Sequence, residues 1–472
     1  MAAKMEPDER RLMKKLLWLG LAACLAMGVS VVLRSQGSEA PAAFDDQTNG
    51  TVDQATHAAD QAKFEEVEKI TDGLGPLYNA QYCRECHQNP TSGGVSQVTE
   101  LRVGHRGANG QFENPTIPIN GGKAVITGRT LVNDRAICRN AAFPDIQLQE
   151  RVSDSENIRT TRLSVNLLGD GFVEAVPDDT LLGIAKKQCE STQHRICGQA
   201  LYVPILEVPG KTGVGRFGWK DQHASLLSFA GDAYLNEIGI TNKLFPDEVT
   251  LLCNAASEPN DTPRSDGLED IDHFARFIRA SKAPPRDTAL AATPAAEEGS
   301  KLFDKVGCST CHARELTTAP AGTVVDGGAF QVPAALGSKQ FHPYGDFLLH
   351  DVGTGDGIAV AVEEHYGRRA MARPWTGFSP AAMLGAANKV RTAPLWGVRT
   401  HSRLMHDGQS LTLTDAIVRH KGEAEQATEA FKHLTPEQQE AILPSSNRYE
   451  VGRPICLLTR AKFQLDFPPF SM

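Results

Sequence analysis

The hydrophobic and polar positions along the chain first set an N-terminal segment apart. Residues 16–33 form an apolar run interrupted only by Gly, Ser and Cys. Four basic residues stand before this run: Arg10, Arg11, Lys14 and Lys15. Basic residues in this place keep the N-terminus inside, so that the rest of the chain is exported. We predict that residues 1–34 form an uncleaved hydrophobic helix that tethers a periplasmic protein to the inner membrane, with a cleaved signal peptide as the alternative.

Beyond residue 60, apolar positions recur with helical spacing only in short stretches, between long segments rich in Gly, Pro and polar residues. This spacing predicts helices over 225–238 and 271–280. A further helix begins at Thr412, whose hydroxyl can cap it. Its positions at i, i+3, i+4 and i+7 fall on one face, namely Leu413, Ala416, Ile417 and His420. The pattern predicts a mainly α fold with long loops and a few short strands.

Two five-residue stretches of one kind carry the chemistry. They are Cys83-Arg84-Glu85-Cys86-His87 and Cys308-Ser309-Thr310-Cys311-His312. The pattern C-x-x-C-H is the covalent attachment site of c-type haem, whose vinyl groups bond to the thiols and whose iron takes the His as axial ligand. A zinc site built from both Cys pairs is the alternative, but zinc does not need a His directly after each pair. The sequence therefore predicts two covalently bound c-type haems, with His87 and His312 as iron ligands.

The motifs and the composition together suggest how the chain is divided. Residues 35–60 are rich in Ala, Gln, Asp, Ser and Thr and are predicted to be a linker. Pro284 and Pro285 mark a boundary between two cytochrome c-like haem domains. We place the first domain at 61–290, the second at 291–443 and an irregular C-terminal tail at 444–472.

Charge and cysteine content narrow the function and the compartment. The formal net charge is −9, which makes nucleic acid binding improbable and suits a basic redox partner protein. Hydrophobic content of 41% and charged content of 22% indicate a globular chain. Of the ten cysteines, Cys189 and Cys197 are close enough to form a small disulfide loop in an oxidising compartment, and Cys138 with Cys253 is a second candidate pair.

Further site residues follow from local context. His420 faces the core at a helix end, so it is either a haem iron ligand or a hydrogen-bonded core histidine. His105 is the nearest later His to the first motif and is a candidate distal ligand there. Glu174, alone in an apolar stretch, is a candidate proton donor with a raised pKa or an ordinary loop acid. Trp219 is either an electron relay between haems or a core residue.

Six separated blocks fall in the order found in one family: 73–87, 169–177, 215–220, 347–353, 392–397 and 405–424. On these residues the chain resembles the di-haem oxidoreductase family, which is distantly similar to bacterial di-haem cytochrome c peroxidases. The resemblance implies that His420 occupies the place of the second haem's far ligand, commonly Met. It also implies that Trp219 lies between the haems and that Glu237 stands near the acid–base Glu.

The resemblance is incomplete at two places. Ser228 or Phe229 stands near the position of the peroxidase Gln, which puts ordinary peroxidase activity in doubt. The peroxidases also hold calcium between the haems, but the matching segment here reads Thr400-His401-Ser402. Calcium is therefore only a candidate further cofactor.

These observations predict an exported di-haem oxidoreductase that exchanges electrons with a redox partner and acts on peroxide or another bound substrate. Glu174, Glu237 and Trp219 are its candidate catalytic residues. The alternatives are a pure electron-transfer cytochrome and a partner protein that handles haem or iron without turnover. The second motif, with His420 as a second ligand, is expected to be closed, whereas the first is expected to be the reactive site.

Overall fold

The computed structural model describes residues 37–119, 124–139, 149–248, 250, 253 and 258–443. The predicted N-terminal helix within 1–34 and the predicted tail at 444–472 lie outside these ranges. Across the described ranges, every helix is too short or too polar to cross a membrane.

Helices form where caps and apolar spacing agree. Ser225 caps α5 by accepting a hydrogen bond from the N–H of Ser228, and Thr412 caps α12 in the same way from Asp415. The predicted helices over 225–238 and 271–280 are confirmed as α5 and α6. The longer helices are α2 (Gln54–Phe64), α4 (Asp178–Ser191), α5 (Leu226–Ile238), α6 (Asp270–Ala280), α8 (Pro294–Lys305), α13 (Glu425–Lys432) and α14 (Pro436–Ile442). The shorter ones are α3 (Asp170–Glu174), α7 (Thr288–Ala291), α9 (Val362–Tyr366), α10 (Arg368–Met371), α11 (Pro380–Gly385) and α12 (Leu413–Val418).

Strands are short and form several small sheets. The largest sheet centres on β3 (Thr99–Arg106), which pairs antiparallel with β9 (Ile158–Leu163), β7 (Leu131–Val132) and β4 (Phe112–Glu113). A three-stranded sheet joins β1 (Ser38–Glu39), β15 (Lys339–Phe341) and β12 (Leu316–Thr317). The remaining strands pair in twos: β2 (Leu77–Tyr78) with β8 (Arg135–Ala136), β5 (Thr116–Ile119) with β6 (Ala124–Thr127), β10 (Tyr202–Pro204) with β11 (Thr212–Val214), β13 (Val324–Val325) with β14 (Phe330–Gln331), and β16 (Leu349–His350) with β17 (Val390–Arg391).

The prediction of a mainly α fold is wrong, because 32% of the structure is helical and 16% is strand. The reason is visible in β3, which reads Thr-Glu-Leu-Arg-Val-Gly-His-Arg and has no clean alternation of apolar and polar positions. Its main partner, β9, lies more than 50 residues away in the sequence. Pairing at that distance leaves no local pattern for a sequence argument to detect.

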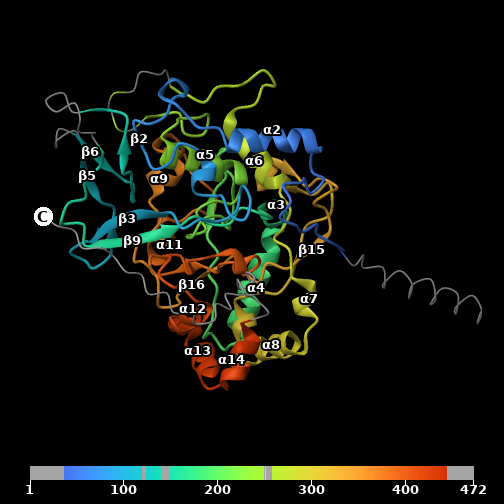
Figure 1. Cartoon of the computed structure of the whole chain (residues 1–472). Coiled ribbons are helices and arrows are strands. Elements are labelled where there is room, and N and C mark those ends of the chain that lie inside the picture. The colour runs from blue at the N-terminus through green and yellow to red at the C-terminus, as the bar shows by residue number, and fades with distance from the viewer. Residues whose placement is uncertain are drawn as a thin grey trace, which may run out of the picture.

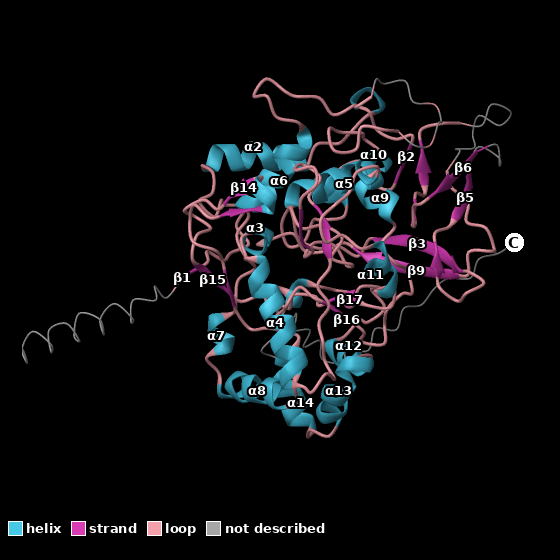
Figure 2. Cartoon of the chain, turned by 180° about the vertical axis from the view of Figure 1, so that it is seen from behind, coloured by secondary structure: helices cyan, strands magenta, loops and turns pink. Residues whose placement is uncertain are grey.

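The two predicted haem domains share one core. The largest cluster of buried apolar side chains takes residues from both sides of position 290, among them Phe64, Phe172, Phe277, Leu316, Phe341 and Trp396. Figures 1 and 2 show α2, α5 and α6 grouped at one end of the molecule, and α8, α13 and α14 at the other. The strands β3 and β9 lie at the side, and α4 runs between the two ends.

The segment predicted as a linker, 35–60, is folded onto this body wherever it is described. Ser38 and Glu39 pair in parallel with Lys339 and Gln340 of β15. Its polar composition concealed this pairing, because an edge strand buries little apolar surface. Asp53 then caps α2, whose Phe64 is buried in the main core.

A smaller core joins α8 and α14. Gly299 of α8 lies so close to the carbonyl of Ala441 that any side chain at this position would clash with it. Leu302, Phe303 and Ile442 are buried beside this crossing. Helix α8 ends three residues before the second C-x-x-C-H motif, and the crossing fixes the position of that end.

Candidate functional site

The two C-x-x-C-H motifs adopt the same local structure. Each begins with a single turn of 3-10 helix, Cys83–Glu85 and Cys308–Thr310. The backbone N–H of His87 donates to the carbonyl of Cys83 at 3.1 Å, and that of His312 to Cys308 at 3.0 Å. This turn brings both thiols and the imidazole of each motif close together, as attachment of one haem requires.

The cysteines divide cleanly between two roles. The predicted pairs Cys138–Cys253 and Cys189–Cys197 are both disulfides. Among the described residues, the four free cysteines are those of the two motifs. Their thiols are therefore available for thioether bonds, whereas Cys24 and Cys456 lie outside the described ranges.

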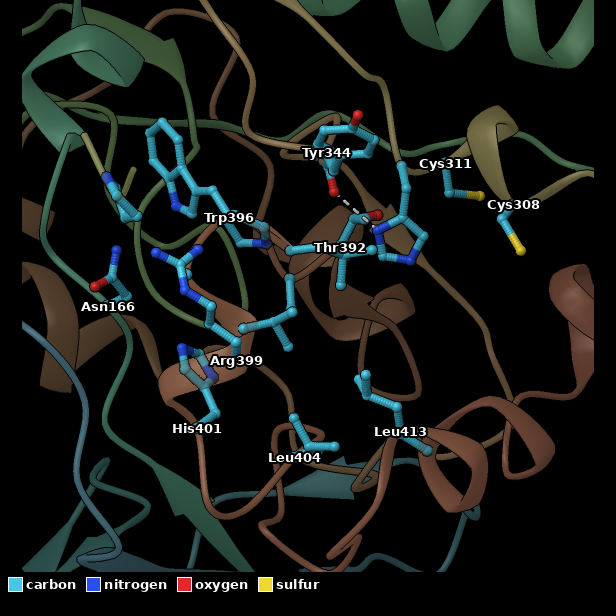
Figure 3. A pocket seen from close by; sticks show the side chains of 18 of the residues that line it. Asn166, Cys308, Cys311, Tyr344, Thr392, Trp396, Arg399, His401, Leu404 and Leu413 are labelled. Atoms are coloured by element: carbon cyan, nitrogen blue, oxygen red, sulfur yellow. Dashed lines mark hydrogen bonds between the residues drawn. The ribbon is translucent and has the colours of Figure 1, made fainter. Parts of the chain in front are cut away.

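A cavity of about 370 Å³ opens in front of the second motif (Figure 3). Its lining includes both thiols and two imidazoles of opposite elements, together with an aromatic and aliphatic surround: Cys308, Cys311, His312, His420, Phe303, Leu395, Trp396, Leu413 and Ile417. The N–H at Nδ1 of His312 donates to the carbonyl of Tyr344 at 2.9 Å, the bond drawn in Figure 3. Burial lowers the pKa of His312 to about 4. The other nitrogen, Nε2, is therefore unprotonated and able to bind iron.

His420 presents the same arrangement from the other side. Its Nδ1–H donates to the carbonyl of Ala416 at 2.7 Å, one turn back along α12, and burial lowers its pKa. It lines the same cavity as His312 and is near enough to contribute to the lowered pKa of that imidazole. Helix α12 ends at Val418, so His420 follows the helix rather than lying within it. Both imidazoles line one cavity, where they could hold a haem iron, and each is oriented by a backbone carbonyl.

The first motif is packed against strand β9 and the turn that follows it. Ser164 donates from its hydroxyl to the carbonyl of Cys86 at 2.7 Å. Burial lowers the pKa of His87 to about 4, offset in part by the nearby backbone of Gly94 and Val165. The ring of Phe64 lies 6.3 Å from that of His87. His87 is thus also a neutral imidazole suited to bind iron.

Glu237 lies beside this first motif. Its backbone carbonyl accepts hydrogen bonds from the N–H groups of Asn79 at 2.7 Å and Ala80 at 3.1 Å, just ahead of Cys83. Burial and the hydrogen-bonded carboxyl of Glu100 raise the pKa of Glu237 well above its usual range. Glu237 and Glu100 are also, after burial, causes of the raised pKa of Cys86. Glu237, which the sequence named as a candidate, is therefore a carboxyl group with a raised pKa beside the first motif.

Sequence reasoning missed the partners of Glu237. Arg102 donates to Glu100 at 2.9 Å, forms a close ion pair with the buried Glu364, and lies 3.8 Å from Glu237. One guanidinium thus faces three carboxyl groups, which favours a shared proton between Glu100 and Glu237. Glu100 and Arg102 stand two apart in β3 and so share a face. That spacing was the available signal, but it needed the strand to be recognised.

His105, the predicted distal ligand of the first iron, contacts two carboxylates in the structure. Its Nδ1 lies 2.9 Å from Glu156 and its Nε2 lies 3.3 Å from Glu113. The hydrogen bond to Glu156 is the main cause of its raised pKa, and the side chain is partly exposed. Both ring nitrogens are thus occupied by carboxylates. Ligation of the first iron by His105 stays a prediction, and these contacts do not favour it.

Glu174 has the contacts of a structural ion pair. It is fully buried at the end of α3, and its carboxylate accepts hydrogen bonds from Arg279 at 2.6 and 2.8 Å and from the N–H of Leu226 at 2.7 Å. These bonds tie α3, α5 and α6 together. A proton-donating role for Glu174 remains untested, and this set of bonds offers it no substrate contact.

Trp219 lies between the surroundings of the two motifs. Its indole N–H donates to the carbonyl of Leu163 at 2.7 Å, next in sequence to Ser164, which binds Cys86. The indole also lines the cavity in front of the second motif, and its ring lies 6.1 Å from the ring of His406. The relay predicted for Trp219 is not tested by these contacts, but they connect it to both regions.

Comparison with known proteins supplies the class. Residues 144–444 match the family described as "Di-haem oxidoreductase, putative peroxidase". The match covers more than half of the chain, and the chain belongs to this family. It includes the second motif, whereas the first motif precedes the matched range.

The other comparisons add little. No curated protein matches the chain. A solved structure of hydrazine synthase from Kuenenia stuttgartiensis, held under 20 bar of xenon, aligns at 22% identity with a TM-score of 0.23. The alignment covers 37% of this chain and 54% of that one. A TM-score this low supports no further argument.

Proposed function

We propose that the protein is an exported c-type oxidoreductase that passes electrons, by way of two haems, from a redox partner to peroxide or another bound substrate. Membership in the di-haem family supports the two haems. Covalent attachment at Cys83, Cys86, Cys308 and Cys311 is supported by the free thiols of both motifs. Haem bound at these sites would supply centres that accept and donate single electrons.

The observation that carries this proposal is the difference between the two sites. At the second, His312 and His420 offer two unprotonated nitrogens to the same cavity. At the first, His87 has no such partner in the described contacts, and His105 is held elsewhere. A site with one protein ligand leaves a position for substrate, whereas a site with two suits electron transfer.

The residues around the first motif can manage protons. Burial and the neighbouring Glu100 disfavour a second negative charge and raise the pKa of Glu237 well above its usual range. Such a carboxyl can donate a proton to an oxygen atom of a bound substrate. Arg102 then balances the charge that remains on the pair. This supports a peroxidase-like reaction even though the Gln position of the peroxidases is occupied by Ser228 or Phe229.

A pure electron-transfer cytochrome is the second candidate, and the closed geometry at the second motif is the observation that favours it. Both irons would then be six-coordinate. Calcium has little support here: in the described part of the chain, each cluster of three potential metal ligands contains His, whereas calcium prefers oxygen ligands. His401, from the segment matched to the calcium site, instead lines the cavity in front of the second motif (Figure 3).

Electronic spectra and stopped-flow mixing with hydrogen peroxide test the proposal on the full-length, haem-loaded protein. We expect one high-spin and one low-spin haem, and a rapid spectral change on mixing. Glu237→Gln should slow this change by about 10²-fold or more, since it removes the proton donor. Two low-spin haems that do not react with peroxide would favour the electron-transfer function instead. Fractionation of cells, with and without residues 1–34, tests export and the membrane tether.

A further inference from the structure

A buried polar cluster lies directly behind Cys311. His350 of β16 is at its centre, 1% exposed, with Asp346 on one side and Glu423 on the other. Gln188 of α4 donates to Asp346 at 2.6 Å and to the carbonyl of Thr310 at 2.6 Å. The cluster is therefore tied to the attachment turn of the second motif.

The contacts of His350 determine its charge. Nε2 lies 3.0 Å from Asp346 Oδ2, and Nδ1 lies 2.9 Å from Glu423 Oε2. A neutral imidazole has only one N–H, so one of its nitrogens would turn a lone pair towards a carboxylate oxygen. Both contacts are hydrogen bonds only if both nitrogens carry protons. Burial opposes this charge, but the bonds to Asp346, Cys311 and Glu423 raise the pKa of His350 well above its usual range.

This charge is close to the point of haem attachment. Nδ1 of His350 lies 3.8 Å from Cys311 Sγ, the sulfur predicted to bond to the haem. Asp221 also interacts electrostatically with His350. It is fully buried, and burial raises its pKa well above the usual range. The two carboxylates that contact the nitrogens of His350 are those of Asp346 and Glu423.

We propose that His350 is a positioning residue of the second site: an imidazolium fixed beside Cys311 that raises the reduction potential of the haem attached there. A positive charge in a poorly hydrated place favours the state that has gained an electron. The effect would offset the low potential expected for an iron with two imidazole ligands. The proposal rests on covalent attachment at Cys308 and Cys311, but not on peroxide chemistry at the first site.

Redox potentiometry of the full-length, haem-loaded protein tests it through His350→Gln and His350→Lys. Gln can still form hydrogen bonds but has no charge, whereas Lys retains the charge. At a fixed applied potential near the midpoint of the second haem, Gln should reduce the ferrous-to-ferric ratio about tenfold, which is about 59 mV for one electron. Lys should restore most of this loss. The potential of the first haem, read in the same titration, is the internal control.

Glu423→Gln gives a second, opposite test, because it removes a negative charge and leaves the imidazolium bound to Asp346. Its ferrous-to-ferric ratio should rise. Visible spectra must show that the second haem stays low-spin. His433→Gln, at the exposed residue that follows α13, is a matched surface control. Equal shifts in the Gln and Lys variants of His350, or a Glu423→Gln shift in the same direction as His350→Gln, would overturn the proposal. If His350→Gln fails to bind haem, an unchanged or lowered ratio in Glu423→Gln overturns it alone.

Discussion

The two haem attachment regions begin from one motif and one backbone turn, yet their surroundings are opposite in kind. Around Cys308–His312, a second imidazole and a fixed ion cluster complete the site. Around Cys83–His87, carboxyl groups gather without a second imidazole in the described contacts. The two motifs are therefore alike as candidate attachment sites, and they differ in the elements that pack around them.

The carboxyl groups of the two regions differ in charge as well. Near the first motif, burial raises the pKa of Glu68 to about 7 and that of Glu237 well above its usual range. Near the second, burial opposes ionisation of Glu423, but the hydrogen bond from His350 lowers its pKa overall. Two carboxyl groups near the first motif thus have raised pKa values, whereas Glu423 near the second is an ion-pair partner of His350. This contrast fits the reaction proposed for the first site and the electron transfer proposed for the second.

The largest expected effect is loss of a whole cofactor. The double variants Cys83→Ala with Cys86→Ala, and Cys308→Ala with Cys311→Ala, should each lose one of the two covalent haems. Intact mass and the pyridine haemochrome spectrum measure this directly. Replacing Cys189 and Cys197 by Ser, as a control, should leave both haems in place. If a double variant keeps both haems, its motif is not a haem attachment site, and the comparison of the two regions fails.

The next effect concerns the iron ligands. His420→Ala should convert the second haem from low-spin to high-spin, because it removes one of two axial nitrogens. His105→Ala is the matched control and should leave both spectra unchanged, since its ring is held by Glu113 and Glu156. Electron paramagnetic resonance of the oxidised protein distinguishes the two results. The reverse outcome would exchange the roles assigned to the two regions.

A smaller effect should appear in the pH dependence of the first site. Glu100→Gln removes the neighbouring charge that, after burial, raises the pKa of Glu237. Glu237 should then lose its proton at lower pH, so the alkaline limb of the peroxide rate profile should move to lower pH. Stopped-flow rates across the pH range measure the shift. An unmoved limb would mean that Glu237 does not share its proton with Glu100.

The smallest effect is on stability. Glu68 is buried against the hydroxyl of Tyr234, and its pKa rises from 4.5 to about 7 on folding. The folded state therefore holds this proton more tightly, and stability falls by up to about 3 kcal/mol as pH rises from below 4.5 through 7. Glu68→Gln should flatten this dependence in urea unfolding at pH 5 and pH 8. Glu423→Gln should act with the opposite sign, removing stability that is present above the unfolded pKa and lost in acid.

The second region was the more predictable of the two. His420 lies one helical turn from Ala416, and Thr412 caps the start of the helix before it. Short-range spacing was therefore enough to place His420 on a core face. His350 was missed there because Cys311, Asp346 and Glu423, which contact it, come from three separate segments. No periodicity links those positions. His105 shows the same limit, because its contacts with Glu113 and Glu156 cannot be read from its place in the sequence.

The amino-acid pattern alone predicted the two candidate attachment sites, both candidate disulfide pairs, His420 as a second ligand and several helices. Attachment of haem depends on residues within one turn of the chain, and such neighbours remain neighbours in any fold. The tertiary structure added properties that the pattern did not show: the carboxyl groups gathered around Arg102 and the ion cluster of His350. Those properties depend on burial and on contacts between segments that stand far apart in sequence. Folding thus gives two copies of one motif different chemistry, since pKa values and ligand geometry are set by what packs around them.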